Sequence, residues 1–208
     1  MNVIHSPPAT PSAILRPAAV LFDCDGVLAD SESLANVLVA AEMTSLGWPM
    51  TAAAARDAFL GMALPDMVPV VEARVGPLPA DWPAQLRDRF TAHMGAHVLA
   101  IPGAADAVAA IRAAGLPVAV ASNSGRAELA VKLRRLGLAD HFGGRTFSFQ
   151  DVARPKPEPD IYLAAARACG AAPADCVVIE DSATGARAGR AAGCRVLGFA
   201  HESDGLAL

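Results

Sequence analysis

The chain has 208 residues, of which 53% are hydrophobic and 18% are charged, and its formal net charge is −4. This composition predicts a folded core and excludes a mainly disordered protein. The negative balance gives no electrostatic footprint for nucleic acid, and no apolar run reaches the roughly 20 residues that a membrane-spanning helix needs. We therefore expect neither a nucleic-acid partner nor a membrane partner.

Residues 1–17 are rich in proline and have neither the charged start nor the apolar run of a signal peptide. They are predicted to form a flexible tail. The cysteines show no C-x-x-C spacing and no disulfide framework, which predicts reduced thiols and a cytoplasmic location. They are Cys24, Cys169, Cys176 and Cys194.

A buried strand is predicted over residues 18–22, followed by a long all-helical insertion over residues 31–98. Apolar residues recur at helical spacing from Leu34 to Ala41, and glycines and prolines divide the remainder into short helices. The stretches 26–31 and 98–102 are candidate hinges of this insertion. Its core is expected to include Phe59, Met62, Leu64 and Met67.

Strands and helices alternate along the rest of the chain. Further strands are predicted at 117–121, 146–149, 176–179 and 195–199. Helices are predicted at 104–114, 126–136, 160–169 and 183–192. This alternation is typical of a parallel sheet covered by helices on both faces. The expected fold is therefore α/β, with a Rossmann-like core formed by residues 18–30 and 99–208 and a separate helical cap.

Residues suited to phosphate chemistry form four motifs, each of which is placed at the end of an apolar run. The motifs are Asp23-Cys24-Asp25-Gly26, Ser122-Asn123-Ser124, Arg154-Pro155-Lys156-Pro157 and Glu180-Asp181-Ser182. Ligands of parallel sheets bind beyond the carboxyl ends of the strands, so these side chains are expected to converge. Each motif alone also has an ordinary explanation, namely a solvated turn, a helix cap or a surface lysine.

The paired aspartates suggest metal-assisted phosphoryl transfer. Two carboxylates at one strand exit repel each other unless a cation lies beside them, and Mg²⁺ prefers oxygen ligands. Asp23 is the candidate nucleophile, and Asp25 is the candidate general acid and base. Lys156, stiffened by a proline on each side, would offer a positive charge to the phosphate, and Ser122 and Asn123 would bind it.

In this order and spacing, the four motifs resemble those of the haloacid dehalogenase-like (HAD) superfamily. The first and last motifs look most like the subfamily with a helical cap, which includes phosphoglycolate phosphatases, sugar-phosphate phosphatases and beta-phosphoglucomutase. The resemblance implies that Mg²⁺ is held by Asp23, the backbone carbonyl of Asp25 and Asp181. It leaves open whether Glu180 binds the metal directly or through water. It also implies a substrate contact near Gly61.

The function expected from this resemblance is hydrolysis of a small phosphorylated metabolite, a sugar or sugar-acid phosphate, through an aspartyl-phosphate. A phosphosugar mutase is the first alternative, although Ala35 stands where those mutases carry a hinge histidine. A non-catalytic binding protein with this fold is the second alternative. A dehalogenase is disfavoured because that branch lacks the second aspartate. We expect a monomer or weak dimer, and a further element after Phe199.

Other polar features have ordinary structural explanations. His93 and His97 lie four residues apart, but no third metal ligand is apparent, so they are expected to be surface histidines. The basic run Lys132, Arg134 and Arg135 is expected to form a solvated helix face.

Overall fold

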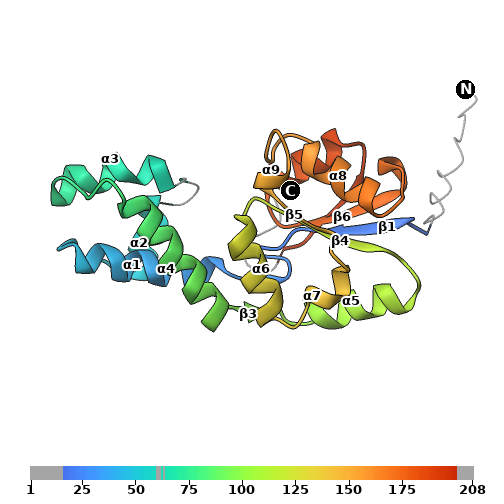
Figure 1. Ribbon diagram of the computed structural model, residues 1–208, viewed down its shortest axis with the longest axis horizontal. Coiled ribbons are helices and arrows are strands. Elements are labelled where there is room, and N and C mark those ends of the chain that lie inside the picture. Colours follow the sequence, from blue (N-terminus) through green and yellow to red (C-terminus); the bar gives the residue numbers. More distant parts are fainter. Residues whose placement is uncertain (1–15, 60–61, 63, 201–208) are drawn as a thin grey trace, which may run out of the picture.

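A five-stranded parallel sheet forms the centre of the computed structural model, which describes residues 16–59, 62 and 64–200 (Figure 1). The strand order is β5-β4-β1-β6-β7, so β1 lies in the middle and pairs with β4 and β6. The strands are β1 (Ala19–Phe22), β4 (Val118–Ser122), β5 (Thr146–Ser148), β6 (Cys176–Glu180) and β7 (Arg195–Gly198). The predicted parallel sheet is confirmed.

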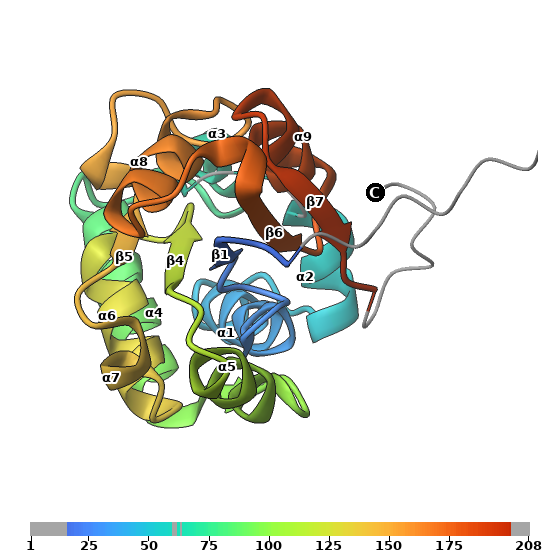
Figure 2. The same cartoon turned by 90° about the vertical axis from the view of Figure 1, so that its right-hand side faces the viewer.

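Helices cover both faces of this sheet (Figure 2). In β1, Val20 and Phe22 pack in one cluster with α5, α6 and α7, whereas Ala19 and Leu21 pack in another with α8 and α9. This division follows from the alternation of side chains along a strand. The helices are α5 (Ala104–Ala113), α6 (Arg126–Arg135), α7 (Ala139–Phe142), α8 (Asp160–Ala168) and α9 (Ala183–Ala191).

The segment inserted after β1 is helical and has its own core, apart from the sheet (Figure 1). Its helices are α1 (Glu32–Ser45), α2 (Ala52–Phe59), α3 (Leu64–Val75) and α4 (Trp82–His97), and the described residues between 31 and 98 contain no strand. Phe59 and Met67 are buried in this core and Leu64 packs against it, as predicted. The prediction was wrong for Met62, which is 42% exposed.

The two candidate hinge stretches lie side by side as a small antiparallel sheet that was not predicted. It consists of β2 (Ala29–Asp30) and β3 (Leu99–Ala100). The backbone N–H of Ile101 donates to the carbonyl of Leu28 at 3.0 Å and extends the pairing. Both connections between the sheet and the helical insertion are thereby tied to each other.

One predicted strand is shorter than expected, and two predicted segments lie outside the described residues. The strand predicted at 146–149 ends at Ser148, because the Ser148 hydroxyl caps a short 3₁₀ helix, η1 (Phe149–Asp151). A second 3₁₀ helix, η2 (Pro173–Asp175), precedes β6. The tail over 1–15 and any element beyond residue 200 lie outside the described residues.

The cysteines are free thiols, as predicted. Among the described residues, no helix combines the length and the apolar character needed to cross a membrane.

Candidate active site

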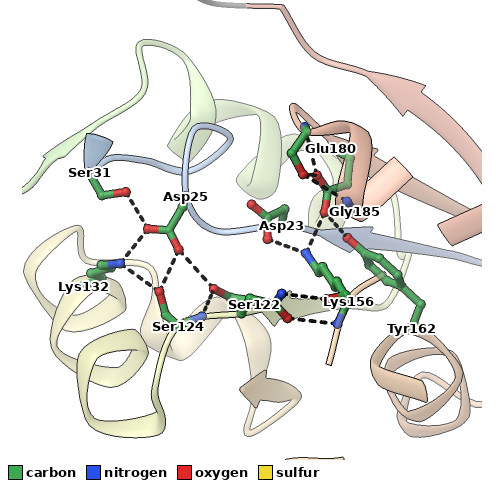
Figure 3. Close-up of polar contacts among 12 residues, drawn as sticks. Asp23, Asp25, Ser31, Ser122, Ser124, Lys132, Lys156, Tyr162, Glu180 and Gly185 are labelled. Atoms are coloured by element: carbon green, nitrogen blue, oxygen red, sulfur yellow. Dashed lines mark hydrogen bonds and ion pairs between the residues drawn. The ribbon is translucent and has the colours of Figure 1, made fainter. Parts of the chain in front are cut away.

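Three strand ends and one loop bring the predicted site residues together (Figure 3). Asp23 follows β1 directly, Ser122 is the last residue of β4, and Glu180 is the last residue of β6. Lys156 lies in the loop between η1 and α8. Because these strands are parallel neighbours, their carboxyl ends meet at one edge of the sheet, as the motif positions predicted.

The Lys156 ammonium lies between two buried carboxylates. Its Nζ donates to Asp23 Oδ1 and to Glu180 Oε1, each at 2.6 Å, and only 6% of the residue is exposed. Burial favours the neutral amine, but the charges of Asp23 and Glu180 outweigh it and raise the pKa of Lys156 above its ordinary value. The lysine is therefore a fixed positive charge.

Asn123 holds the loop that carries this lysine. The backbone N–H of Lys156 donates to Asn123 Oδ1, and Asn123 Nδ2 donates to the Lys156 carbonyl, both at 3.1 Å. The Asn123 side chain therefore positions Lys156. The backbone of Asn123 remains the part that the prediction assigns to substrate.

Glu180 is fully buried, and both of its oxygens already have donors. Oε1 accepts from Lys156 and from the Tyr162 hydroxyl at 2.8 Å, and Oε2 accepts from the Ser182 hydroxyl at 2.9 Å. The Ser182 hydroxyl in turn accepts from the N–H of Gly185 and caps α9. The helix-cap explanation therefore holds for Ser182 and not for the acids before it.

Sequence reasoning missed Tyr162 and Gly185, which both contact Glu180. A Cβ on Gly185 would lie 1.6 Å from Glu180 Oε1, so only glycine leaves room for this carboxylate. Tyr162 carries no local sequence signal, because it belongs to α8 and meets Glu180 only in the folded protein. Gly185 lies in the first turn of α9, just after the Glu180-Asp181-Ser182 motif, so its place beside that motif was the available signal.

Asp181 joins Asp23 and Glu180 in an acidic cluster, in which one carboxylate oxygen from each residue lies within 4.8 Å of the other two. Burial raises the pKa of Asp23 well above its ordinary value; Lys156 opposes this, and Glu180 adds to it. Burial and then Glu180 raise the pKa of Asp181 to about 6. One ammonium against three carboxylates leaves excess negative charge, and an oxygen-ligated divalent cation fits this donor set.

The side chain of Asp25 points away from this cluster, towards α6 (Figure 3). Its Oδ1 accepts from Lys132 Nζ and from the Ser31 hydroxyl, each at 2.5 Å. Its Oδ2 accepts from the hydroxyls of Ser124 at 2.7 Å and Ser122 at 3.1 Å. The Asp25 carboxylate therefore takes no part in the acidic cluster, and a metal contact through its carbonyl stays a prediction.

The prediction that Lys132 lies on a solvated face was wrong, whereas Arg134 and Arg135 are exposed as expected. Lys132 is 1% exposed because it falls on the core-facing stripe of α6, between Leu129 and Leu133. That helical spacing was the available sequence signal.

Electrostatics hold the Asp25 carboxylate in its ionised form. Burial alone would raise the pKa of Asp25, but the Lys132 ammonium and the hydroxyls of Ser31 and Ser124 outweigh burial and leave this pKa well below its ordinary value. The pKa of Lys132 is raised for the reciprocal reason, since Asp25 and Glu128 overcome the effect of burial.

Two cavities adjoin the site and share Asp25 and Asn123 in their walls. The smaller, about 250 Å³, is lined by Asp23, Lys156 and Asp181. The larger, about 700 Å³, lies between the sheet and the helical insertion, with walls that include Met62, Leu64, Arg87, Arg126 and Phe149. The predicted contact at Gly61 lies outside the described residues.

Comparison with known proteins decides the family. A family model described as haloacid dehalogenase-like hydrolase matches residues 17–193. The chain belongs to this family. The chain is similar to 6-phosphogluconate phosphatase of Escherichia coli, with 29% identity over 88% of this chain and 83% of that protein. Hexitol phosphatase A of E. coli is 30% identical over 91% of this chain and 86% of that protein.

A solved structure of the same family supports the fold. The HAD family hydrolase of Deinococcus radiodurans, determined with bound phosphate and sodium, is 37% identical to this chain. The similarity covers 88% of this chain and 80% of that one, with a TM-score of 0.73.

In this HAD hydrolase, Gly26 leaves the space that Asp181 occupies. Gly26 has φ +74°, and a Cβ there would lie 1.8 Å from Asp181 Oδ2. Gly26→Ala is expected to lower the free energy of unfolding by at least about 2 kcal/mol, because backbone strain adds to displacement of a half-buried carboxylate. Urea denaturation measures the loss.

Gly47→Ala is the matched control for this prediction. Gly47 also has positive φ, +87°, but nothing lies within 4 Å of the position of its Cβ. It should show the backbone strain alone, about 1 kcal/mol. Equal losses in the two variants would contradict a steric role for Gly26.

Proposed function

We propose that this HAD hydrolase is a Mg²⁺-dependent phosphatase that acts on a small phosphorylated sugar or sugar acid through an aspartyl-phosphate at Asp23. The observation that carries the proposal is the buried Lys156 ammonium fixed between Asp23 and Glu180, with Asp181 beside them in a small cavity. The phosphatase relatives support the same reaction class.

The first half-reaction transfers the phosphoryl group to the protein. A carboxylate oxygen of Asp23 attacks phosphorus, and the bond to the leaving oxygen of the substrate breaks. Lys156 holds Asp23 and offsets the negative charge of the phosphoryl oxygens. Asp25 relays a proton from the phosphate monoanion of the substrate to the leaving oxygen and so releases an alcohol; its carboxyl is ionised before and after this step, as its low pKa requires.

The second half-reaction restores the protein. A water molecule gives a proton to Asp25, its oxygen bonds to phosphorus, and the bond between phosphorus and Asp23 breaks. Inorganic phosphate leaves, Asp23 returns to its carboxylate form, and Asp25 releases its proton to the departing phosphate or to solvent. Ser122, which is fully buried at the end of β4, donates its hydroxyl to Asp25 Oδ2 at 3.1 Å and helps to hold this carboxylate in place.

Asp23 and Asp181 are the residues that would hold Mg²⁺. The bound cation would supply charge neutralisation for the phosphate and for the acidic cluster. Glu180 would not bind the cation directly, because its oxygens already accept hydrogen bonds from Lys156, Tyr162 and Ser182. Its role is to orient Lys156 and the loop that carries Asp181.

In this proposal, the larger cavity binds the organic part of the substrate. Arg87 of α4 and Arg126 of α6 bring positive charge to its wall, and Met62 and Leu64 bring apolar surface. A volume of about 700 Å³ lies within the usual range for small-molecule sites. A contact from Gly61 belongs to this proposal as well.

A panel of phosphorylated sugars, sugar acids and p-nitrophenyl phosphate tests the proposal. With Mg²⁺, we expect release of inorganic phosphate from members of the panel, and loss of that release with EDTA. Conversion of a hexose 1-phosphate to the 6-phosphate without phosphate release would instead indicate a mutase. A folded protein that acts on no member of the panel would contradict the proposal.

The metal requirement should depend on pH. The pKa of Asp181 is raised to about 6, and a carboxylate must lose its proton before it binds a cation. Below pH 6 protons therefore compete with Mg²⁺, and the concentration that gives half-maximal activity should rise by up to about tenfold per pH unit. Magnesium titrations between pH 5 and pH 8 measure this, and an unchanged midpoint would contradict the assignment of Asp181.

A further inference from the structure

The helix α6 contains a buried lysine that the reaction above does not use. Lys132 Nζ lies 2.5 Å from Asp25 Oδ1 and 3.0 Å from the Ser124 hydroxyl, and it also pairs with Glu128. Burial of an ammonium is costly unless the charge is paired and hydrogen-bonded. This lysine is paired with Asp25, one of the two acids at the strand exit.

The two oxygens of the Asp25 carboxylate have hydrogen-bond partners of different kinds. An ammonium can only donate a hydrogen bond, so the oxygen facing Lys132, Oδ1, can only accept. The partners of Oδ2 are the hydroxyls of Ser122 and Ser124, which can donate or accept by rotation about the C–O bond. The two oxygens of this carboxylate are therefore not equivalent.

The difference between the two oxygens matters because Asp25 lies at the boundary between the two cavities. Asp25 lines both the small cavity that contains Asp23 and the large cavity that adjoins the helical insertion. A carboxylate at this boundary can reach both a leaving oxygen and an attacking water. Its side chain is 36% exposed, whereas that of Lys132 is 2% exposed and lies behind it.

We propose that Lys132 is a positioning residue that anchors Oδ1 of Asp25 and leaves Oδ2 directed at the water that hydrolyses the aspartyl-phosphate. The proposal rests on the proposed function. In this step the water proton goes to Oδ2 of Asp25, the water oxygen bonds to phosphorus, and the phosphorus–Asp23 bond breaks. Lys132 contacts neither the substrate nor Asp23.

The variant Lys132→Met tests this with p-nitrophenyl phosphate and Mg²⁺. Nitrophenolate leaves without help from an acid, so kcat/KM reports transfer to Asp23, whereas kcat includes hydrolysis of the intermediate. We expect kcat to fall by about 10- to 100-fold and KM to fall in parallel, with kcat/KM nearly unchanged. After an acid quench, mass spectrometry should find the phosphorylated protein accumulated.

Arg135→Met is the matched control. It removes the same charge from the same helix at an exposed position and should match the parent protein in kcat and KM. Because Lys132→Met leaves Asp25 and Glu128 without their cation, the double variant Glu128→Gln/Lys132→Met removes one of these charges. It should show the same split between kcat and KM if the single variant does not fold.

The outcomes separate the two proposals. An equal fall in kcat and kcat/KM without accumulated phosphoprotein would overturn the positioning role and indicate a structural lysine. Unchanged kinetics in a folded variant would also overturn it. No phosphate release by the parent protein from any substrate would overturn the proposed function itself.

Discussion

Asp23→Asn is expected to lower kcat by at least about 10⁴-fold, because an amide cannot form the acyl-phosphate intermediate. The fold should survive the change. Burial raises the pKa of Asp23 well above its ordinary value, so a neutral side chain is tolerated there without metal. Phosphate-release kinetics and thermal unfolding measure the two effects.

Asp57→Asn is the control for this change, since Asp57 is exposed on α2, away from the site residues. It should keep the parent activity. A folded Asp23→Asn protein with activity within about tenfold of the parent would remove Asp23 from the role of nucleophile.

Lys156→Met should have the second largest effect, on both activity and stability. It removes the cation that separates Asp23 from Glu180 and leaves two buried carboxylates facing each other. Activity should fall by at least about 10³-fold, and the free energy of unfolding without metal by about 3–5 kcal/mol. Kinetics and urea denaturation measure these losses.

The double variant Asp23→Asn/Lys156→Met separates the two consequences. With one carboxylate neutralised, it should regain part of the lost stability and none of the activity. Strict additivity of the two stability changes would show that Asp23 and Lys156 do not interact in the folded protein.

The strand-end motifs made the sheet and the central part of the site predictable. Asp23, Ser122 and Glu180 each follow an apolar run, and strand direction alone brings such ends together. The clustering of Asp23 with Lys156 and Asp181 followed from this geometry. The roles assigned to these residues remain predictions until the variants are measured.

The parts that sequence reasoning missed depend on contacts between elements. Tyr162 meets Glu180 only because α8 packs on β1 and β4, and Ser31 meets Asp25 only through the turn at Gly26. The pairing of β2 with β3 joins segments about 70 residues apart and is too short to leave a period in the sequence. For Lys132, the basic composition of the segment 126–135 concealed its place on the apolar stripe.

The most direct test of the account is chemical trapping of the covalent intermediate. The protein is mixed with p-nitrophenyl phosphate and Mg²⁺, quenched with acid during turnover and reduced with borohydride, which converts an aspartyl-phosphate to homoserine. Peptide mass spectrometry should find homoserine at position 23 and nowhere else. Steady phosphate release without this product, or with homoserine at position 25 or 181, would contradict Asp23 as the group that carries the phosphoryl.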